Sequence, residues 1–303
     1  MPSGLNDADW KILLQRIEDR ECTPFIGAGA SAGTVPVARD LAAAWAEEYG
    51  YPLADRSDLA RVAQFLAVEQ DPIFPKQLLR EQLQAVTPPD FAAADDPHGM
   101  LADLDLPLYI TTNYDGLMSG ALASRGKEPT RELCGWNDLV RELQPSALDA
   151  GFTPTPSTPL VYHLHGHGDV PQSMVLTEDD YLAFLVRIST DNTVRLLPSK
   201  IRSALATTSL LFVGYSLSDW DFRVLFRGLM GSLGSTLGMT SIAVQLDPSS
   251  ADEPEERRRH AQTYLNSYFE KIQTIKVRLY WGDARDFAHE LRERRKEFLA
   301  SRV

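Results

Sequence analysis

The chain has 303 residues, of which 44% are hydrophobic, and a formal net charge of −12. This size and apolar content suit one large or two coupled domains with a real core, and the negative charge argues against direct nucleic-acid binding. The only cysteines are Cys22 and Cys134, which excludes a disulfide framework and a cysteine-based zinc module. We expect a cytoplasmic protein without membrane contact, because no signal peptide and no apolar run of ~20 residues is found.

The first third of the chain changes from an alternating pattern to an all-helical one. Apolar spacing predicts a helix at 7–20, a strand at 23–26, a glycine turn at 27–33 and a helix ending at Gly50. Residues 56–90 then predict two or three helices without strands, punctuated by prolines. We therefore expect one domain over 1–303, in which 21–55 and 98–303 form a Rossmann-like core and 56–97 form a small helical insert.

The alternation of strands and helices resumes after the insert. Strands are predicted at 108–112, 160–164, 209–213, 241–246 and 275–281. Helices are predicted at 116–124, 178–187, 193–206, 221–230, 253–272 and 284–300, and 144–159 is a Pro-, Ser- and Thr-rich loop. Strands separated by helices predict an α/β fold with a doubly wound, mostly parallel sheet.

A glycine-rich turn follows the first predicted strand. Gly27-x-Gly29-x-x-Ala32 fits the dinucleotide fingerprint, in which small residues let backbone N–H groups approach a pyrophosphate. A tight structural turn would explain the same residues, because the fingerprint alone is a weak signal.

Polar residues end the second predicted strand. Asn113, Tyr114 and Asp115 follow the β-branched run Tyr109–Thr112. In parallel α/β sheets ligands bind outside the carboxyl ends of the strands, so this amide and this carboxylate are candidates to hold a polar ligand. Either residue could instead cap the following helix, and the two roles are compatible.

Three histidines end the next strand, in His163-Leu164-His165-Gly166-His167. Strand alternation would turn His163 and His165 to the same side. We interpret His163 as a hydrogen-bonded structural residue and His165 as a candidate general base, since its near-neutral pKa suits proton removal. A metal site is the alternative, but no carboxylate stands at a ligand spacing.

Two later strand ends carry similar residues. Gly214-Tyr215-Ser216 would permit backbone contact with a phosphate or ribose, and Asp247 could bind ribose hydroxyls. Helix capping by Asp219 and turn initiation at Asp247 are the structural alternatives. The run 257–259 of three arginines lies among glutamates and indicates a solvated face or an oligomer contact.

Together these motifs resemble the SIR2-like domains of bacterial defence proteins, within the sirtuin superfamily. The matching segments are Gly27–Ser31, Thr111–Asp115, His163–Gly166 and Phe212–Asp219. They occur in the family's order, and the resemblance extends over roughly residues 20–290.

The resemblance implies NAD as the ligand and, by position, a role for each residue. Asn113 would hold the nicotinamide ribose and the attacking water, Asp115 the carboxamide, and His165 would be the general base. The cofactor-binding residues implied in the same way are Gly27, Ala28, Gly29, Ser31, Thr112, Gly214, Tyr215, Ser216 and Asp247.

Two departures from the sirtuin deacylases bear on the reaction. The four-cysteine zinc module cannot form, and Pro36–Asp40 replaces the family's Asp-Phe-Arg segment. The resemblance therefore implies an NAD hydrolase that acts in anti-phage abortive infection, without a metal. The alternatives are an NAD-dependent deacylase and a non-catalytic NAD or ADP-ribose sensor. It also implies a homo-oligomer, or a separate regulator such as a HerA-type ATPase or an Argonaute-type protein.

Overall fold

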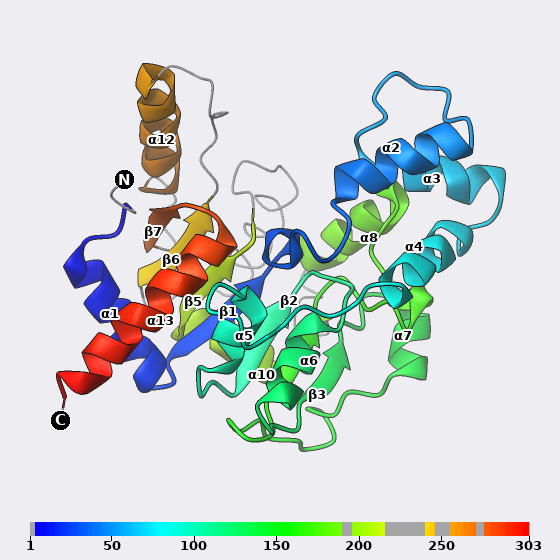
Figure 1. Cartoon of the computed structure of the whole chain (residues 1–303). Helices are drawn as coiled ribbons and strands as arrows, with labels where there is room; N and C mark the ends of the chain where they lie inside the picture. Colours follow the sequence, from blue (N-terminus) through cyan, green and yellow to red (C-terminus); the bar gives the residue numbers. More distant parts are fainter. Residues whose placement is uncertain (1–3, 190–195, 216–239, 246–254, 271–275, 303) are drawn as a thin grey trace.

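The computed structural model describes residues 4–189, 196–215, 240–245, 255–270 and 276–302. Within these ranges seven parallel strands form one sheet in the order β3-β4-β2-β1-β5-β6-β7 (Figure 1). The strands are β1 (Cys22–Ile26), β2 (Leu108–Thr111), β3 (Thr130–Leu133), β4 (Leu160–His163), β5 (Ser209–Val213), β6 (Thr240–Gln245) and β7 (Lys276–Trp281). The α/β prediction with a parallel sheet is confirmed.

Helices cover both faces of the sheet, as a doubly wound fold requires. One face packs against α1 (Asp7–Glu18), α5 (Pro97–Ala102), α6 (Leu117–Ser124) and α13 (Ala284–Ala300). The other packs against α8 (Glu178–Ser189), α10 (Ser199–Thr207) and α12 (Glu255–Glu270). The central strands β1, β2, β4 and β5 are buried along their whole length, which explains their continuous apolar sequences.

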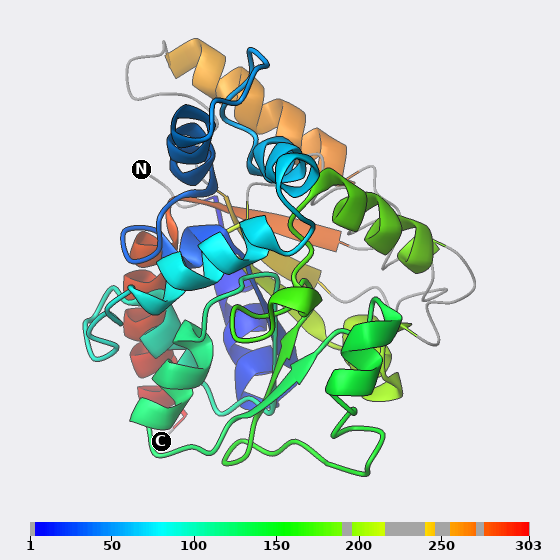
Figure 2. The same ribbon diagram turned by 90° about the vertical axis from the view of Figure 1, so that its right-hand side faces the viewer.

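A separate hydrophobic cluster joins α2 (Ala38–Glu48), α3 (Leu59–Glu69) and α4 (Phe74–Gln84). Figure 2 shows these helices grouped above the carboxyl edge of the sheet, beside α8. The cluster takes in Met174 and Leu176, just before α8. Since α2 shares this cluster, the helical layer begins earlier than the expected insert at 56–97, and that domain division stays a prediction.

Polar contacts fix the helical layer to the start of α8. The Lys76 ammonium, on α4, lies 2.9 Å from the Asp180 carboxylate, and the Lys76 side chain is 8% exposed. Gln64, on α3, donates to Asp179 at 2.9 Å and accepts from its backbone N–H at 3.0 Å. Asp180 also accepts from the N–H of Thr177, which caps α8. The layer and α8 are thus one packed unit.

The helix α5 lies where the sequence predicted none, and two further elements were also not predicted. They are the edge strand β3 and the short helix α7 (Asp138–Leu143). The predicted helix 193–206 corresponds to α10 (Ser199–Thr207), and its first residues, up to 195, lie outside the described ranges. The predicted helix 221–230 lies wholly outside the described residues. No helix within the described ranges is long and apolar enough to cross a membrane.

Candidate functional site

The site lies where the loops after β1, β2 and β5 meet at the carboxyl edge of the sheet. These strands are adjacent, with β1 between the other two. The N–H of Gly27 donates to the Val213 carbonyl at 2.9 Å, and the N–H of Gly29 donates to the Gly214 carbonyl at 2.8 Å. The glycine loop, which includes the 3-10 helix Ala28–Ser31, is therefore bound directly to the end of β5.

Backbone packing explains the glycines of this contact. A Cβ on Gly27 would lie 2.8 Å from the Gly214 oxygen, and one on Gly214 would lie 2.1 Å from the Ala30 nitrogen. Gly214 also has a φ of +80°, which disfavours side chains. Close packing thus accounts for Gly27 and Gly29, whose N–H groups are bonded within the protein, and their predicted contact with a cofactor stays a prediction. Ala28 is exposed at the start of the 3-10 helix, as are Ala32 and Gly33 after it.

Thr112 and Tyr215 connect the loops after β2 and β5. Their hydroxyl groups lie 2.6 Å apart, and the Tyr215 hydroxyl also donates to the Ile26 carbonyl at 3.1 Å. Burial raises the pKa of Tyr215 well above its ordinary value, so the phenol stays protonated. The structure therefore brings both predicted residues to the β1 loop.

Asn113, Ser31 and Asp115 form a hydrogen-bonded chain across the β1 and β2 loops. The Asn113 amide nitrogen donates to the Gly27 carbonyl at 3.2 Å and to the Ser31 hydroxyl at 3.1 Å. The Ser31 hydroxyl in turn donates to Asp115 Oδ2 at 2.9 Å. Asn113 and Ser31 are both buried. These contacts fix the Asn113 amide, and its oxygen is left as the acceptor for a ligand.

The N-cap residue of α6 is Gly116, which has no side-chain cap bond, so neither Asn113 nor Asp115 is the helix cap. Asp115 Oδ1 accepts from the Leu117 N–H at 3.0 Å, at the start of α6. Asn113 makes its side-chain contacts with the β1 loop instead. A carboxylate oxygen can accept more than one hydrogen bond, so Asp115 can still accept from a ligand.

His163 is a structural residue, as the sequence suggested. Its Nδ1 lies 3.1 Å from the Asn113 carbonyl oxygen, which can only accept, so Nδ1 carries a hydrogen. Burial is the main cause that lowers the pKa of His163 to about 3. The bond holds the backbone of Asn113 from the neighbouring strand.

His165 packs against α8, on the face of the sheet opposite to that of His163. Its ring meets Phe184 at 5.0 Å and Tyr181 at 5.6 Å between centroids, both edge to face. The expectation that His163 and His165 share a side is wrong, because β4 ends at His163 and the alternation stops there. Burial lowers the pKa of His165 to about 3, so the ring is neutral.

The register of the sheet places His165 and Asn113 at equivalent heights. Thr111 of β2 pairs with His163 of β4, and each candidate residue follows its strand by two positions. Asn113 and His165 therefore end neighbouring strands.

His167 lies beside Asp169 and Arg131, a residue of β3. The Arg131 guanidinium lies 2.6 Å from the Asp169 carboxylate and 3.0 Å from His167 Nδ1. The Asp169 backbone N–H also donates to His167 Nδ1 at 3.0 Å. Burial, followed by the charge of Arg131, lowers the pKa of His167 to about 4.

A cavity of about 310 Å³ adjoins Asp115 and His167. It lies between α4, the segment after it, the start of α6 and the loop at 167–169. Apart from glycines, its lining residues are Arg80, Leu83, Gln84, Val86, Pro88, Phe91, Tyr114, Asp115, Leu117, His167 and Asp169. Its size is at the lower end of small-molecule sites, ~300–1,000 Å³, and its apolar walls with a few polar groups are typical of them.

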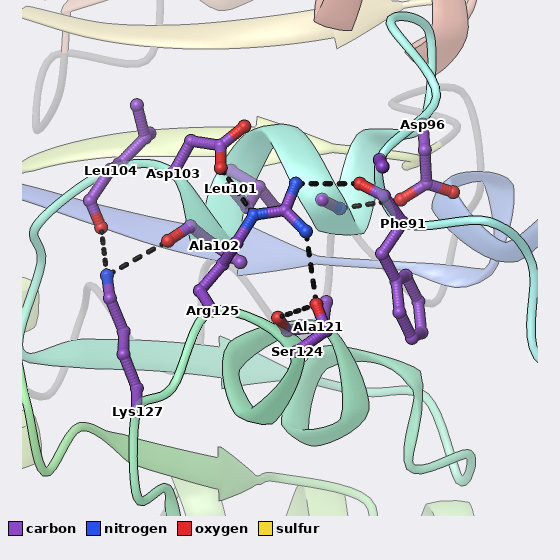
Figure 3. Close-up of polar contacts among 12 residues, drawn as sticks. Phe91, Asp96, Leu101, Ala102, Asp103, Leu104, Ala121, Ser124, Arg125 and Lys127 are labelled. Carbon is purple, nitrogen blue, oxygen red and sulfur yellow. Dashed lines mark hydrogen bonds and ion pairs between the residues drawn. The ribbon is translucent and has the colours of Figure 1, made fainter.

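Arginine contacts with the backbone hold the wall that contains Phe91. Arg125, which ends α6, donates to the Phe91 carbonyl at 2.8 Å and to Asp103 at 2.6 Å (Figure 3). Arg292, on α13, donates to the Ala93 carbonyl and reaches Asp103 at 3.0 Å. The wall of the cavity is thereby tied to the main fold.

Some of the expected site residues cannot be located, and some lining residues had not been expected. Ser216 and Asp247 lie outside the described residues. Arg80 and Phe91 of the cavity wall were missed, as was Arg131 beside His167, because no motif marks them and they come from three separate parts of the chain. Within the described ranges, no group of three His, Cys, Asp or Glu side chains could hold a metal ion.

Comparisons with known proteins agree with this geometry. The SIR2-like domain family matches residues 107–271. NAD(+) hydrolase ThsA of Cytobacillus dafuensis is 26% identical over 231 residues, which cover 74% of this chain and 42% of that protein. NAD(+) hydrolase ThsA of Bacillus cereus (strain MSX-D12) is 26% identical over 214 residues, which cover 69% of this chain and 40% of that protein.

A third relative has a name connected with defence. Defense-associated sirtuin 2 of Bacillus subtilis is 29% identical over 147 residues, which cover 46% of this chain and 12% of that protein. The chain spans about two fifths of the length of the ThsA relatives. More than half of the chain matches the family, and the motifs of that family meet at one edge of the parallel sheet, so the chain belongs to the SIR2-like domain family.

Proposed function

We propose that the chain hydrolyses NAD to nicotinamide and ADP-ribose. The observation that carries the proposal is the chain of hydrogen bonds Asn113–Ser31–Asp115, which ends at a cavity large enough for a pyridine ring. The ThsA relatives, which have the name NAD(+) hydrolase, support the same reaction. The cavity walls include Phe91 and Tyr114, whose rings suit a flat and initially cationic base.

Hydrolysis of the glycosidic bond develops positive charge on the ribose, while nicotinamide leaves as a neutral molecule. The reaction therefore needs no strong acid. It needs a site that binds the nicotinamide and the ribose and that orients the attacking water. Asp115 would accept from the carboxamide, and the Asn113 oxygen would accept from a ribose hydroxyl or from the water. The fixed amide nitrogen of Asn113 sets the direction of that oxygen.

His165 would take the proton of the attacking water. Its pKa of about 3 makes it a weak base in the ligand-free protein. A weak base is sufficient where water adds to a strongly cationic centre, because the water becomes acidic as the bond forms. A positioned base of this kind contributes ~10²–10⁴ in rate.

The remaining binding roles follow the strand ends. Ala28, Gly29 and Ser31 would face the pyrophosphate and ribose, with Gly27 and Thr112 in support. Gly214, Tyr215, Ser216 and Asp247 would contact the adenosine half. Gly27, Gly29, Gly214 and Tyr215 also hold the loops together, so substitutions there would affect folding and binding at once.

In the cell, the proposed hydrolysis would deplete NAD as an anti-phage abortive-infection response in the cytoplasm. Such an activity needs control, which we assign to self-association or to a separate protein such as a HerA-type ATPase or an Argonaute-type protein. We also propose that residues 1–303 form a single SIR2-like domain in which residues 56–97 are a helical insert.

The test is to incubate the purified chain with NAD and follow nicotinamide by chromatography. We expect release by the wild type and a loss of at least 100-fold in Asn113→Ala and in His165→Ala. Asn266→Ala and His289→Ala are matched controls at exposed helix positions and should keep full activity. If His165→Ala hydrolysed NAD at the wild-type rate, His165 would not be the general base. Loss of acetyl groups from an acetylated peptide in step with NAD loss would favour deacylation.

A further inference from the structure

His167 ends the histidine motif but has no part in the reaction described above. Its ring lies between two donors and one carboxylate. Both the Asp169 backbone N–H and Arg131 Nη1 lie 3.0 Å from Nδ1, whereas Arg131 Nη1 is 3.4 Å from Nε2. A backbone N–H and a guanidinium have no lone pair to offer, so Nδ1 must be the acceptor. The hydrogen of the neutral ring is therefore on Nε2.

Burial, more than the surrounding charges, keeps the ring of His167 neutral. Burial and the charge of Arg131 both disfavour the imidazolium, and together they outweigh Asp169, which favours it. The ring of His163, 4.8 Å away and edge to face, is itself neutral because its pKa is depressed. The hydrogen bond from Arg131 is the main cause that lowers the pKa of the Asp169 carboxyl, and the charge of Arg80 contributes in the same direction. His167 is thus held in one tautomer as a hydrogen-bond donor.

His167 lines the cavity together with Gly116. A Cβ built on Gly116 would lie 3.6 Å from Nε2, so Gly116 approaches this nitrogen without placing a side chain against it. Asp115, which precedes Gly116 in the chain, lines the same cavity and supplies an acceptor. One donor and one acceptor side by side match a primary carboxamide, which offers a carbonyl oxygen and an NH₂ group.

We propose that His167 is a specificity-determining residue of the site, which donates from Nε2 to the carboxamide oxygen of the leaving pyridine base while Asp115 accepts from its NH₂ group. Arg131 and the Asp169 backbone are positioning groups that fix the tautomer. Together, His167 and Asp115 would select a carboxamide over a carboxylate, because a carboxylate would be repelled by the like charge of Asp115. This inference rests on the proposed NAD hydrolysis.

The experiment compares His167→Phe with His167→Gln on three dinucleotides. Phe keeps a ring without a donor, and Gln keeps an N–H near the position of Nε2. The substrates are NAD, its 3-acetylpyridine analogue, which keeps the carbonyl oxygen but lacks NH₂, and the analogue with an unsubstituted pyridine ring. We expect His167→Phe to lower kcat/KM at least 10-fold for the first two and less than 2-fold for the third. A loss of 10-fold corresponds to one hydrogen bond of about 1.4 kcal/mol.

His167→Gln should recover most of the loss on the two carbonyl substrates. The ratio of kcat/KM between NAD and the unsubstituted analogue does not depend on how much protein is folded, so partial unfolding cannot imitate the result. Equal losses on all three substrates would overturn the inference and leave the hydrolysis proposal intact.

Direct binding separates the inference from turnover. Calorimetry should show that the wild type and His167→Gln bind nicotinamide, that both reject nicotinate, and that His167→Phe loses nicotinamide binding by at least 10-fold. If the wild type releases no nicotinamide from NAD but binds it in this pattern, hydrolysis fails and the carboxamide site stands. Equal binding of nicotinamide by His167→Phe, or none by the wild type, would overturn the site itself.

Discussion

The Ser31 hydroxyl donates to Asp115 at 2.9 Å and accepts from the Asn113 amide at 3.1 Å, so one small side chain joins the loops after β1 and β2. Ser31 is 3% exposed, so its hydroxyl is enclosed almost entirely by the protein. The two residues assigned to the ribose and the carboxamide are therefore oriented through a third that belongs to the glycine loop.

Substitution Ser31→Ala should reduce the proposed hydrolysis without unfolding the protein. We expect kcat/KM for NAD to fall about 10-fold, since each lost hydrogen bond is worth ~1 kcal/mol and Asn113 and Asp115 lose their common partner. The matched control is Ser57→Ala, because Ser57 also donates to a carboxylate, that of Asp55 at 2.8 Å, but in an exposed turn. Steady-state nicotinamide release measures both. An effect of equal size in the control would show that the hydrogen bond at Ser31 is unimportant.

Substitution Gly214→Ala should prevent stable folding. The new Cβ would lie 2.1 Å from the Ala30 nitrogen, and φ is +80°. Gly126→Ala isolates the backbone contribution, since Gly126 has a φ of +72° with nothing within 4 Å of its would-be Cβ. The control should cost about 1–2 kcal/mol, and Gly214→Ala distinctly more. The measurement is the urea midpoint of unfolding for each variant. Equal decreases in Gly214→Ala and Gly126→Ala would contradict the close contact between the β1 and β5 loops.

Substitution Lys76→Met should destabilise the helical layer far more than a surface ion pair would suggest. It leaves the Asp180 carboxylate, whose side chain is 14% exposed, without its cation. Removing one partner of a buried pair costs about 3–5 kcal/mol. Arg61→Met removes the exposed contact with Glu178 and should cost ~1 kcal/mol or less. Chemical denaturation measures both, and similar values would mean that Asp180 is well solvated.

The stability of the protein should fall on acidification from about pH 6.5. The pKa values of His163 and His165 are about 3 and that of His167 about 4 in the folded state, below the ordinary value of 6.5. Between these limits the unfolded chain binds more protons, so the free energy of unfolding rises with pH. Each histidine contributes a slope of at most about 1.4 kcal/mol per pH unit.

His165→Phe removes one of these titrating groups. We expect a shallower dependence of the urea midpoint on pH between 5 and 7 than in the wild type. His289→Phe, at an exposed position of α13, should leave the slope as it is. An unchanged slope in His165→Phe would indicate that His165 is solvated in the folded state.

The sequence predicts the regular parts of this fold well. The bounds of β5 and α13 agree with the predicted ones, because β5 is apolar throughout and α13 keeps a helical spacing of apolar residues. Strand β3 was missed for the opposite reason. Its sequence Thr-Arg-Glu-Leu is short, polar and at the edge of the sheet, so it shows neither an apolar run nor alternation.

The candidate site could be predicted only in part. Asn113 and Asp115 follow a strand, and ligands bind outside the carboxyl ends of parallel strands, so these two were candidates from the sequence itself, whereas Ser31 was expected only from the resemblance to the SIR2-like domains. The cavity was not foreseen, because Arg80 comes from α4, Phe91 from the segment after it, and the Arg131 beside His167 from β3. Such a meeting depends on how helices pack over the sheet, which periodicity does not encode.

The position of β1 between β2 and β5 makes the glycine loop depend on a strand that is synthesised about 180 residues later. A nascent chain that has emerged only as far as β4 contains Asn113 and Ser31, but its central strand has one open edge and Gly29 has no partner carbonyl. The glycine loop takes its final shape only when residues 209–215 leave the ribosome. Interrupted or half-made copies therefore lack the finished glycine loop that the proposed NAD hydrolysis requires.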